Sequence, residues 1–146
     1  MDEPVTLLNQ NNEEVTFPTG EPVVFFFITS YTWGICQQQL VQLHENLDKL
    51  EGIDVQKFII SKDKPENQLE LYTQIEEYYG ESIPFVSDEN LEFVDYMEMK
   101  NGDTAYRGYA LIDGEGALVF NTINDHWGEQ IDKTVEEIKE ELEKLK

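Results

Sequence analysis

The residue with the clearest capacity for chemistry is Cys36, the only cysteine of the chain. It follows an apolar run at residues 23–28 and a polar turn, and the apolar period changes from there to that of a helix beginning near Ile35. In the first turn of a helix, unpaired backbone N–H groups and the positive end of the dipole favour the thiolate. The thiolate is the form of cysteine that attacks peroxides and disulfides. A working thiol is therefore one interpretation of Cys36.

A second interpretation makes Cys36 an inert part of the core. It shares one helical stripe with four leucines, Leu40, Leu43, Leu47 and Leu50, and free cysteine is among the most buried residue types. Its place after a buried strand and before a helix favours function, because ligand sites gather at the carboxyl ends of parallel strands. Both interpretations stay open at this point.

The elements that would position Cys36 follow from the hydrophobic pattern. Residues 5–8 and 14–17 alternate around an asparagine-rich turn and predict an N-terminal hairpin. Residues 22–28 form a continuous apolar run that predicts a strand buried on both faces, as at the centre of a parallel sheet, and VQKFII at 55–60 predicts a second buried strand. The other predicted elements are a helix from Ile35 to Gly52, a helix over 65–80, an extended piece at 83–88, a short helix at 90–99, a hairpin from 105–113 and 117–123, and a helix over 129–146.

The last of these helices is amphipathic, with an apolar face of Ile131, Val135, Ile138, Leu142 and Leu145, and we expect Glu140 to support it by pairing with Lys144. The order hairpin, strand, helix, strand, helix, short insert, two strands, helix predicts an α/β fold with a central mixed sheet flanked by helices. That order matches the thioredoxin-like plan. The length of 146 residues is expected to form a single domain over 1–146.

The composition restricts the classes of partner. A formal net charge of −21 repels nucleic acids and anionic membrane surfaces, so neither is an expected partner. No apolar run is long enough to span a membrane, and the N-terminus lacks the pattern of a secretory signal. The lone cysteine gives no sign of an oxidising compartment, so we expect a cytoplasmic protein. The carboxylates have no metal-ligand spacing, and we expect neither a metal nor a cofactor.

One long motif lies in the second half of the chain, the segment YRGYALIDGEG at 106–116, continued by Asn124, Asp125 and Gly128. In this motif the chain resembles the peroxiredoxins, the alkyl hydroperoxide reductase and thiol-specific antioxidant (AhpC/TSA) group of the thioredoxin-like superfamily. The segment at 84–88 is similar to the family's P-[FL]-x-S-D, and residues 22–36 are similar to the strand leading into its active site.

The resemblance implies an active site. Cys36 takes the place of the peroxidatic cysteine, and Arg107, the only arginine of the chain, that of the active-site arginine. A guanidinium stabilises a thiolate and donates hydrogen bonds to a peroxide oxygen as the O–O bond breaks. Tyr31, Thr32 and Trp33 are further candidates for the substrate pocket. Trp33 has the alternative interpretation of a turn residue that packs on the sheet, which is the favoured one.

The active-site motif of the family, P-x-x-x-T-x-x-C, is only partly matched. Thr29 stands where the family has proline, and Trp33 where it has threonine. Indole accepts no hydrogen bond, so Trp33 cannot replace the threonine hydroxyl. Gln37 stands where a proline usually follows the cysteine, Gln39 where an acid is common, and Glu129 where a second arginine is often found.

A dithiol oxidoreductase cycle is excluded because it needs two thiols. The expected activity is that of a one-cysteine peroxidase, which reduces a hydroperoxide through a sulfenic acid. An external thiol, thioredoxin-like or of low molecular weight, would restore the cysteine. A second copy of the chain, in a homodimer, is a further candidate partner. The alternative is a non-peroxidatic thioredoxin-fold protein that acts as a thiol sensor or a binding module.

Other polar and aromatic residues are predicted to be structural. His44 lies eight residues after Cys36, too far along the helix for hydrogen-bond reach, and is interpreted as solvated or packed. His126 follows the strand-end aspartate, where a role as a base is the less favoured reading. Tyr31, Tyr106 and Tyr109 are interpreted as packing groups with a hydrated hydroxyl.

Overall fold

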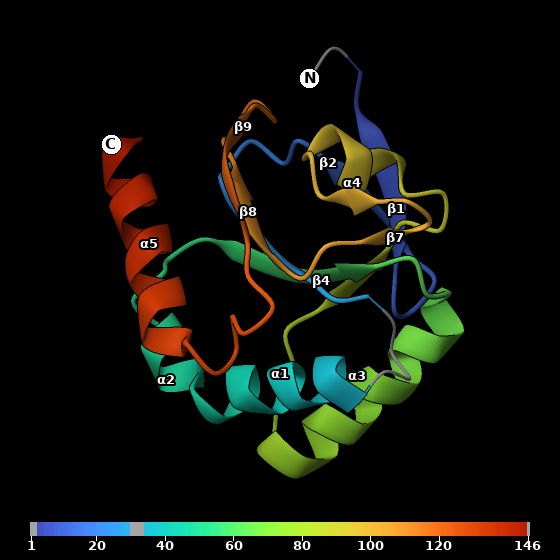
Figure 1. The fold of residues 1–146 in the computed structure, drawn as a ribbon. Coiled ribbons are helices and arrows are strands. Elements are labelled where there is room, and N and C mark those ends of the chain that lie inside the picture. The colour runs from blue at the N-terminus through green and yellow to red at the C-terminus, as the bar shows by residue number, and fades with distance from the viewer. Residues whose placement is uncertain (1–2, 30–33, 146) are drawn as a thin grey trace.

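The main sheet is mixed, as predicted. The computed structural model describes residues 3–29 and 34–145, with the backbone alone for 34–36. Within these residues the main sheet has seven strands in the order β2-β1-β5-β4-β3-β8-β9. The central strands β3 (Val23–Phe27), β4 (Gln56–Ser61) and β5 (Phe85–Ser87) are parallel, and the outer strands pair antiparallel. Helices flank this sheet, with α1 and α3 side by side along one side of it (Figure 1).

The predicted N-terminal hairpin is present. It consists of β1 (Val5–Asn9) and β2 (Glu14–Phe17), paired antiparallel. The side chain of Asn9 accepts hydrogen bonds from the N–H groups of Asn11 and Glu13, at 2.9 and 3.0 Å, so the asparagine closes the turn. β1 also pairs with β5, which extends the sheet beyond the parallel strands.

β3 is buried on both faces, as its unbroken apolar sequence predicts. One set of alternate residues, with Phe26 among them, faces a core formed with α1, α2, α3 and α5, and the other set, with Phe25, faces a core formed with α4 and the hairpin. Of the two neighbours of β3, β4 is parallel to it and β8 is antiparallel, so the sheet is mixed at its centre as well.

The helix predicted from Ile35 to Gly52 is two helices, α1 (Gly34–Glu45) and α2 (Leu47–Leu50). The break falls at Asn46, whose backbone leaves the helical region with φ −117° and ψ 29°. Its side-chain amide donates to the carbonyl of Gln42 at 2.7 Å, so it competes with the helical hydrogen bonds. The prediction of one continuous helix was wrong because it used the leucine spacing and ignored this local competitor.

The second half of the fold follows the predicted order. α3 (Pro65–Tyr79) ends at Gly80, whose φ of 86° is the left-handed conformation of a helix cap. α4 (Glu92–Tyr96) is the short helix of the insert, and the carboxylate of Asp88 accepts the N–H of Val94 at 2.8 Å. A small ribbon of β6 (Lys100–Asn101) and β7 (Thr104–Ala105) follows, which the sequence did not predict.

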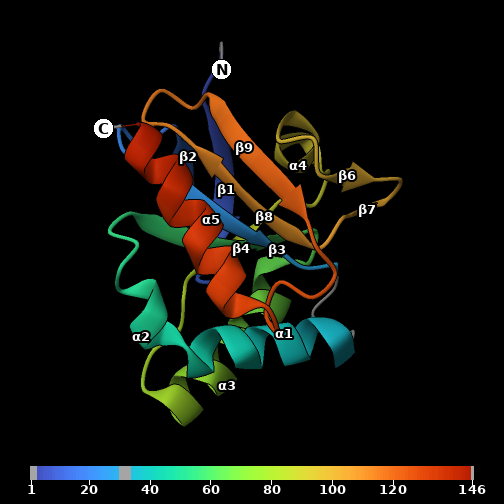
Figure 2. The same ribbon diagram turned by 60° about the vertical axis from the view of Figure 1, so that its left-hand side comes forward.

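The chain ends in the predicted hairpin, β8 (Gly108–Ile112) and β9 (Leu118–Ile123), and in α5 (Ile131–Lys144). α5 packs against the part of the sheet that contains β8 and β9 (Figure 2). Most of its predicted apolar face is buried or half-buried, whereas Leu145 is exposed beyond the helix end. Lys144 pairs with Glu141 at 3.0 Å, whereas the sequence predicted Glu140. None of the helices in the described ranges is long and apolar enough to cross a membrane.

Candidate active site

Cys36 lies in the first turn of α1, as its third residue. β3 ends at Phe27, so the segment that carries Cys36 starts from the carboxyl end of a buried strand. The predicted pocket residues Tyr31, Thr32 and Trp33 lie outside the described residues, as does the side chain of Cys36. The described site is therefore built from the residues that surround the start of α1.

Arg107 reaches the same end of the sheet from β8. It directly precedes Gly108, which is paired with Phe27, the last residue of β3. The backbone carbonyl of Arg107 accepts the N–H of Asn124 at 2.9 Å, so the pairing with the chain after β9 continues past the end of β8. The Arg107 side chain is only 15 % exposed, and its Nη1 is shielded from solvent. Most of the guanidinium is thus inside the protein.

The glycine after Arg107 has a steric reason. A Cβ at Gly108 would lie 1.9 Å from the carbonyl oxygen of Thr122 on β9. Because no side chain fits there, glycine allows β8 and β9 to approach closely at the point where the arginine leaves the sheet. In the R-G pair of the sequence motif, the arginine therefore supplies the charged group and the glycine allows the backbone geometry that holds it.

The guanidinium of Arg107 is bound by Asp125. Both Nε and Nη2 donate to the same oxygen, Oδ1, at 3.1 Å. Charge-assisted bonds of this kind fix the direction of the guanidinium plane as well as its position. Asp125 itself is 62 % exposed, so the pair lies at the border between the protein interior and solvent.

Asp125 is in turn held by α1. The side-chain amide of Gln39, which is 2 % exposed, donates to the backbone carbonyl of Asp125 at 3.1 Å. Gly128 of the same loop touches α1, since a Cβ there would lie 2.9 Å from the Cα of Gln39. Gln39 follows Cys36 by three residues, about one helical turn. The loop at 124–128 thus connects Arg107 to the first half of the helix that carries Cys36.

Sequence reasoning did not assign a role to Asp125 or Gln39. Asp125 was part of the family likeness at a strand end, and Gln39 was noted only as a departure from that likeness. The two residues are 86 positions apart, so no local periodicity reveals that they meet.

The comparison with known families decides the identity of this arrangement. A model of the AhpC/TSA family matches residues 4–121. The chain belongs to the AhpC/TSA family. Membership of this family of thiol peroxidases supports the predicted enzyme class, an oxidoreductase. Among curated proteins, none matches the sequence significantly.

Solved structures of peroxiredoxins share the fold. The peroxidoxin BcpB of Mycobacterium tuberculosis is similar with a TM-score of 0.72 and 16% identity, over 94% of this chain and 92% of that one. The reduced 2-Cys peroxiredoxin of Plasmodium vivax is similar with a TM-score of 0.72 and 18% identity, over 94% of this chain and 90% of that one. The bacterioferritin comigratory protein of Xanthomonas campestris is similar with a TM-score of 0.71 and 14% identity, over 92% of this chain and 90% of that one. The predicted thioredoxin-like fold is confirmed.

Within this AhpC/TSA chain, His44 is a packed histidine, as predicted. Nδ1 is 2.7 Å from the carbonyl of Leu40, to which it donates, and Nε2 accepts the N–H of Ile83 at 3.1 Å. These partners require the neutral ring with its proton on Nδ1. Burial lowers the pKa of His44, against a smaller opposing effect of the bond to Leu40. The ring therefore joins α1 to the segment before β5.

The residues after Asp125 are divided between surface and core. His126 is exposed, and its Nδ1 lies 3.5 Å from a carboxylate oxygen of Glu129. Trp127 is fully buried and stacks on Phe26 with ring centroids 5.2 Å apart. The tryptophan thus anchors the loop to the sheet, while the histidine faces solvent.

Tyr109 is a packing residue, as predicted, but its hydroxyl is bonded within the protein, whereas the prediction was a hydrated one. It is buried in the helix-covered core, and its hydroxyl donates to Glu137 of α5 at 2.6 Å. Burial raises the pKa of Tyr109, and the bond to Glu137 adds to the shift. The tyrosine therefore stays neutral and ties α5 to β8. Tyr106, next to Arg107, is partly exposed.

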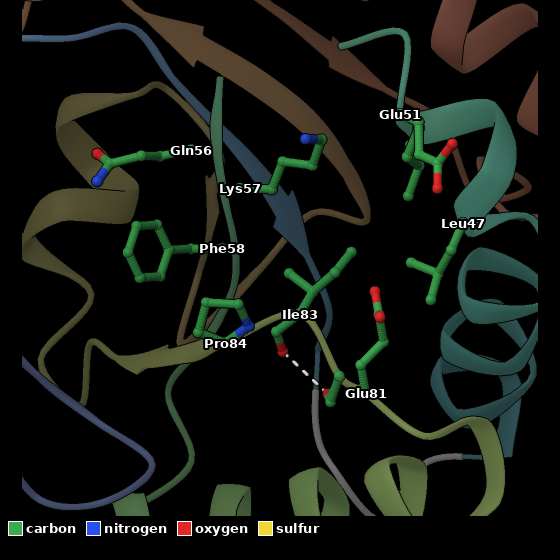
Figure 3. A pocket seen from close by; sticks show the side chains of 10 residues that line it. Leu47, Glu51, Gln56, Lys57, Phe58, Glu81, Ile83 and Pro84 are labelled. Carbon is green, nitrogen blue, oxygen red and sulfur yellow. Dashed lines mark hydrogen bonds between the residues drawn. The ribbon is translucent and has the colours of Figure 1, made fainter. Parts of the chain in front are cut away.

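A pocket at the other end of the parallel strands contains none of the predicted site residues (Figure 3). It has a volume of about 400 Å³ and lies beside Lys57, near the start of β4, and Pro84, just before β5. The Lys57 ammonium donates to the carbonyls of Ile53 and Val55, at 2.6 and 3.1 Å. Burial lowers the pKa of Lys57. The backbone thus already satisfies much of the bonding capacity of this lysine.

Proposed function

We propose that the chain is a thiol peroxidase of the one-cysteine type, with Cys36 as the peroxidatic residue and Arg107 as its electrostatic partner. The observation that carries the proposal is the contact chain from Arg107 through Asp125 to Gln39, one turn after Cys36. Family membership supports the reaction class. The single cysteine supports the one-cysteine type, because no second thiol of the chain can resolve the oxidised form.

In the proposed reaction the Cys36 thiolate attacks the terminal oxygen of a hydroperoxide. The S–O bond forms as the O–O bond breaks, so the sulfur is oxidised and the peroxide reduced. The leaving alkoxide or hydroxide takes up a proton and departs as alcohol or water. The Cys36 sulfenic acid remains on the protein.

The arginine would act twice in this step. Its charge favours the thiolate before the reaction, and its N–H groups donate to the oxygens of the breaking bond, where negative charge develops. Such donors act strongly in a site with little water, and the low exposure of the Arg107 side chain meets that condition. Tyr31 or Thr32, with backbone N–H groups at the start of α1, would complete the pocket.

An external thiol would complete the cycle. It attacks the sulfur of the sulfenic acid and releases water, and a second external thiol then cleaves the mixed disulfide to restore Cys36. The reductant is either a thioredoxin-like protein or a thiol of low molecular weight. A homodimer is part of the same proposal.

The test is the reaction of the reduced protein with one equivalent of hydrogen peroxide. Mass spectrometry with a sulfenic-acid trap should find one modified residue, Cys36, and none in the Cys36→Ser variant. Arg107→Ala should slow the modification about a hundredfold or more, as loss of a transition-state donor does. Absence of a trapped sulfenic acid in the unaltered protein would refute the proposal.

The second candidate function is a thioredoxin-fold protein without peroxidase chemistry, such as a thiol sensor or a binding module. It is favoured by Trp33 and Thr29, which occupy the family's threonine and proline positions. Thr29 is buried, and its carbonyl accepts the hydroxyl of Thr104 at 3.2 Å. For a binding module, iodoacetamide should alkylate Cys36 no faster than free cysteine at neutral pH, and a thiol pKa well below about 8.5 would exclude that role. A thiol sensor would have a reactive Cys36 but no catalytic turnover of hydroperoxide.

A further inference from the structure

We infer that Asp125 is the positioning residue of the active-site arginine, and that it acts on the reaction through Arg107 without touching the peroxide. This inference rests on the proposed peroxidase function. Asp125 is the aspartate that follows strand β9.

The contact between Arg107 and Asp125 is bidentate on the side of the arginine. Two N–H groups of Arg107 converge on one carboxylate oxygen, each at 3.1 Å. The bonds use Nε and Nη2, while Nη1 is shielded from solvent. Asp125 therefore holds the guanidinium from its solvent side and fixes which edge faces the interior.

The backbone around Asp125 is held on both sides. Gln39 holds its carbonyl, and on its amino side Asn124 donates its N–H to the carbonyl of Arg107. The side chain of Asn124 accepts the N–H of His126 at 2.8 Å, which tightens the turn around Asp125. The carboxylate thus projects from a backbone that is fixed to α1 on one side and to β8 on the other. A group held in this way can set the position of its partner within a fraction of an ångström.

The carboxylate of Asp125 also brings a negative charge close to Arg107. An anion bound to Arg107 reduces the positive potential that a neighbouring thiolate feels. Removal of Asp125 should therefore do two things with opposite signs: the more positive field lowers the pKa of the Cys36 thiol, while the misplaced guanidinium slows the reaction with peroxide. A merely structural role for Asp125 does not predict this pair of effects.

The experiment compares Asp125→Ala and Asp125→Asn with the unaltered protein and with Glu129→Gln. Asparagine keeps an oxygen at the Oδ1 position but removes the charge. Glu129→Gln is the matched control, since it removes a carboxylate from the following residues whose described partner is His126, not Arg107. The rate of Cys36 oxidation by hydrogen peroxide and the pH profile of its alkylation by iodoacetamide are measured for each.

We expect Asp125→Ala to slow oxidation about tenfold to a hundredfold, the cost of a misplaced catalytic group. Its alkylation profile should shift to lower pH. Asp125→Asn should show the same direction of shift with a smaller loss of rate, because the acceptor is partly restored. Glu129→Gln should stay within about twofold in rate, as surface substitutions do.

The possible results distinguish failure of the positioning role of Asp125 from failure of the proposed peroxidase function. If the unaltered protein forms no sulfenic acid, both are overturned. If it does, and Asp125→Ala oxidises within about twofold of it, the inference alone is overturned. A slow variant whose thiol pKa rises also overturns it, since that result indicates damage to the start of α1. Circular dichroism checks the fold, and if Asp125→Ala does not fold, Asp125→Asn decides by the same two readouts.

Discussion

The two ends of α1 are held in place by different chemistry. Near its start, Gln39 binds the loop of Asp125, and through it the charged side chain of Arg107 at the edge of the solvent. Near its end, a buried neutral ring, His44, bonds to the backbone of Leu40 and Ile83. The first arrangement is charged and partly exposed, which suits a reacting group. The second is neutral and buried, which suits a structural anchor.

One helix can thus serve stability at one end and catalysis at the other. An exposed carboxylate such as that of Asp125 contributes little to stability, whereas a buried polar group without a partner costs about 1–3 kcal/mol. A change of Asp125 should therefore alter the reaction and spare the fold. Changes at His44 should do the reverse.

The largest expected effect is on the reaction, at the start of the helix. Arg107→Ala should slow oxidation of Cys36 by hydrogen peroxide about a hundredfold to a thousandfold, because a donor to the breaking O–O bond is lost. Stopped-flow kinetics measures the rate. Arg107→Lys is the matched control, since it keeps the charge without the fork, and should recover only part of the rate. Equal rates for the unaltered protein and the two variants would show that Arg107 takes no part in the reaction.

The next largest effect is expected on stability, at the end of α1 that carries His44. His44→Ala should lower the free energy of unfolding by about 2–3 kcal/mol, because the N–H of Ile83 loses its buried acceptor and the side chain leaves a void. Urea unfolding measures this loss. The oxidation rate of the folded variant should change by no more than a few fold. A large loss of rate with unchanged stability would reverse the proposed roles of the two ends.

The pH dependence of stability should sharpen the assignment of His44. Because burial lowers the pKa of His44 below the unfolded value of 6.5, the folded protein binds fewer protons than the unfolded chain just below that pH. The contribution of the neutral ring to the free energy of unfolding is complete above pH 6.5. It is lost as the pH falls toward the lowered pKa, by up to about 1.4 kcal/mol per pH unit. Urea unfolding between pH 7 and about pH 5 should show it.

The control for this prediction is His44→Gln, which cannot titrate. The difference in stability between the unaltered protein and this variant should shrink as the pH falls through the window. A difference that stays constant would contradict the buried neutral ring.

The smallest expected effect is on stability at the start of the helix. Asp125→Asn should change the free energy of unfolding by about 1 kcal/mol or less, because Asp125 is largely exposed. Urea unfolding at neutral pH, in parallel with Glu129→Gln, measures the change. A loss as large as that of His44→Ala would show that both ends of α1 hold the fold.

Much of the fold could be predicted from residue patterns. The buried strand β3, the cap of α3 at Gly80 and the amphipathic α5 are local features, and period, turn residues and burial act there in the same direction. The break at Asn46 could be missed because a single side-chain bond outweighs the leucine spacing. The ribbon of β6 and β7 is only two residues long on each side, too short for an alternating pattern to register.

The site was predictable in part. The R-G pair of β8 stood out, and the structure gives Gly108 its reason. The partners of Arg107 did not stand out, because Asp125 is one carboxylate among many in an acidic chain and Gln39 carries no charge. Their contact depends on how β9 returns to α1 across a long stretch of sequence. Only three-dimensional packing supplies that information.

The most direct test of the central claim is the distance between the Cys36 sulfur and the Arg107 guanidinium in a crystal structure of the reduced protein. The peroxidase proposal predicts that Sγ lies within about 4–6 Å of the guanidinium, close enough for the cation to favour the thiolate. A sulfur packed into the leucine core and pointing away from Arg107 would contradict it.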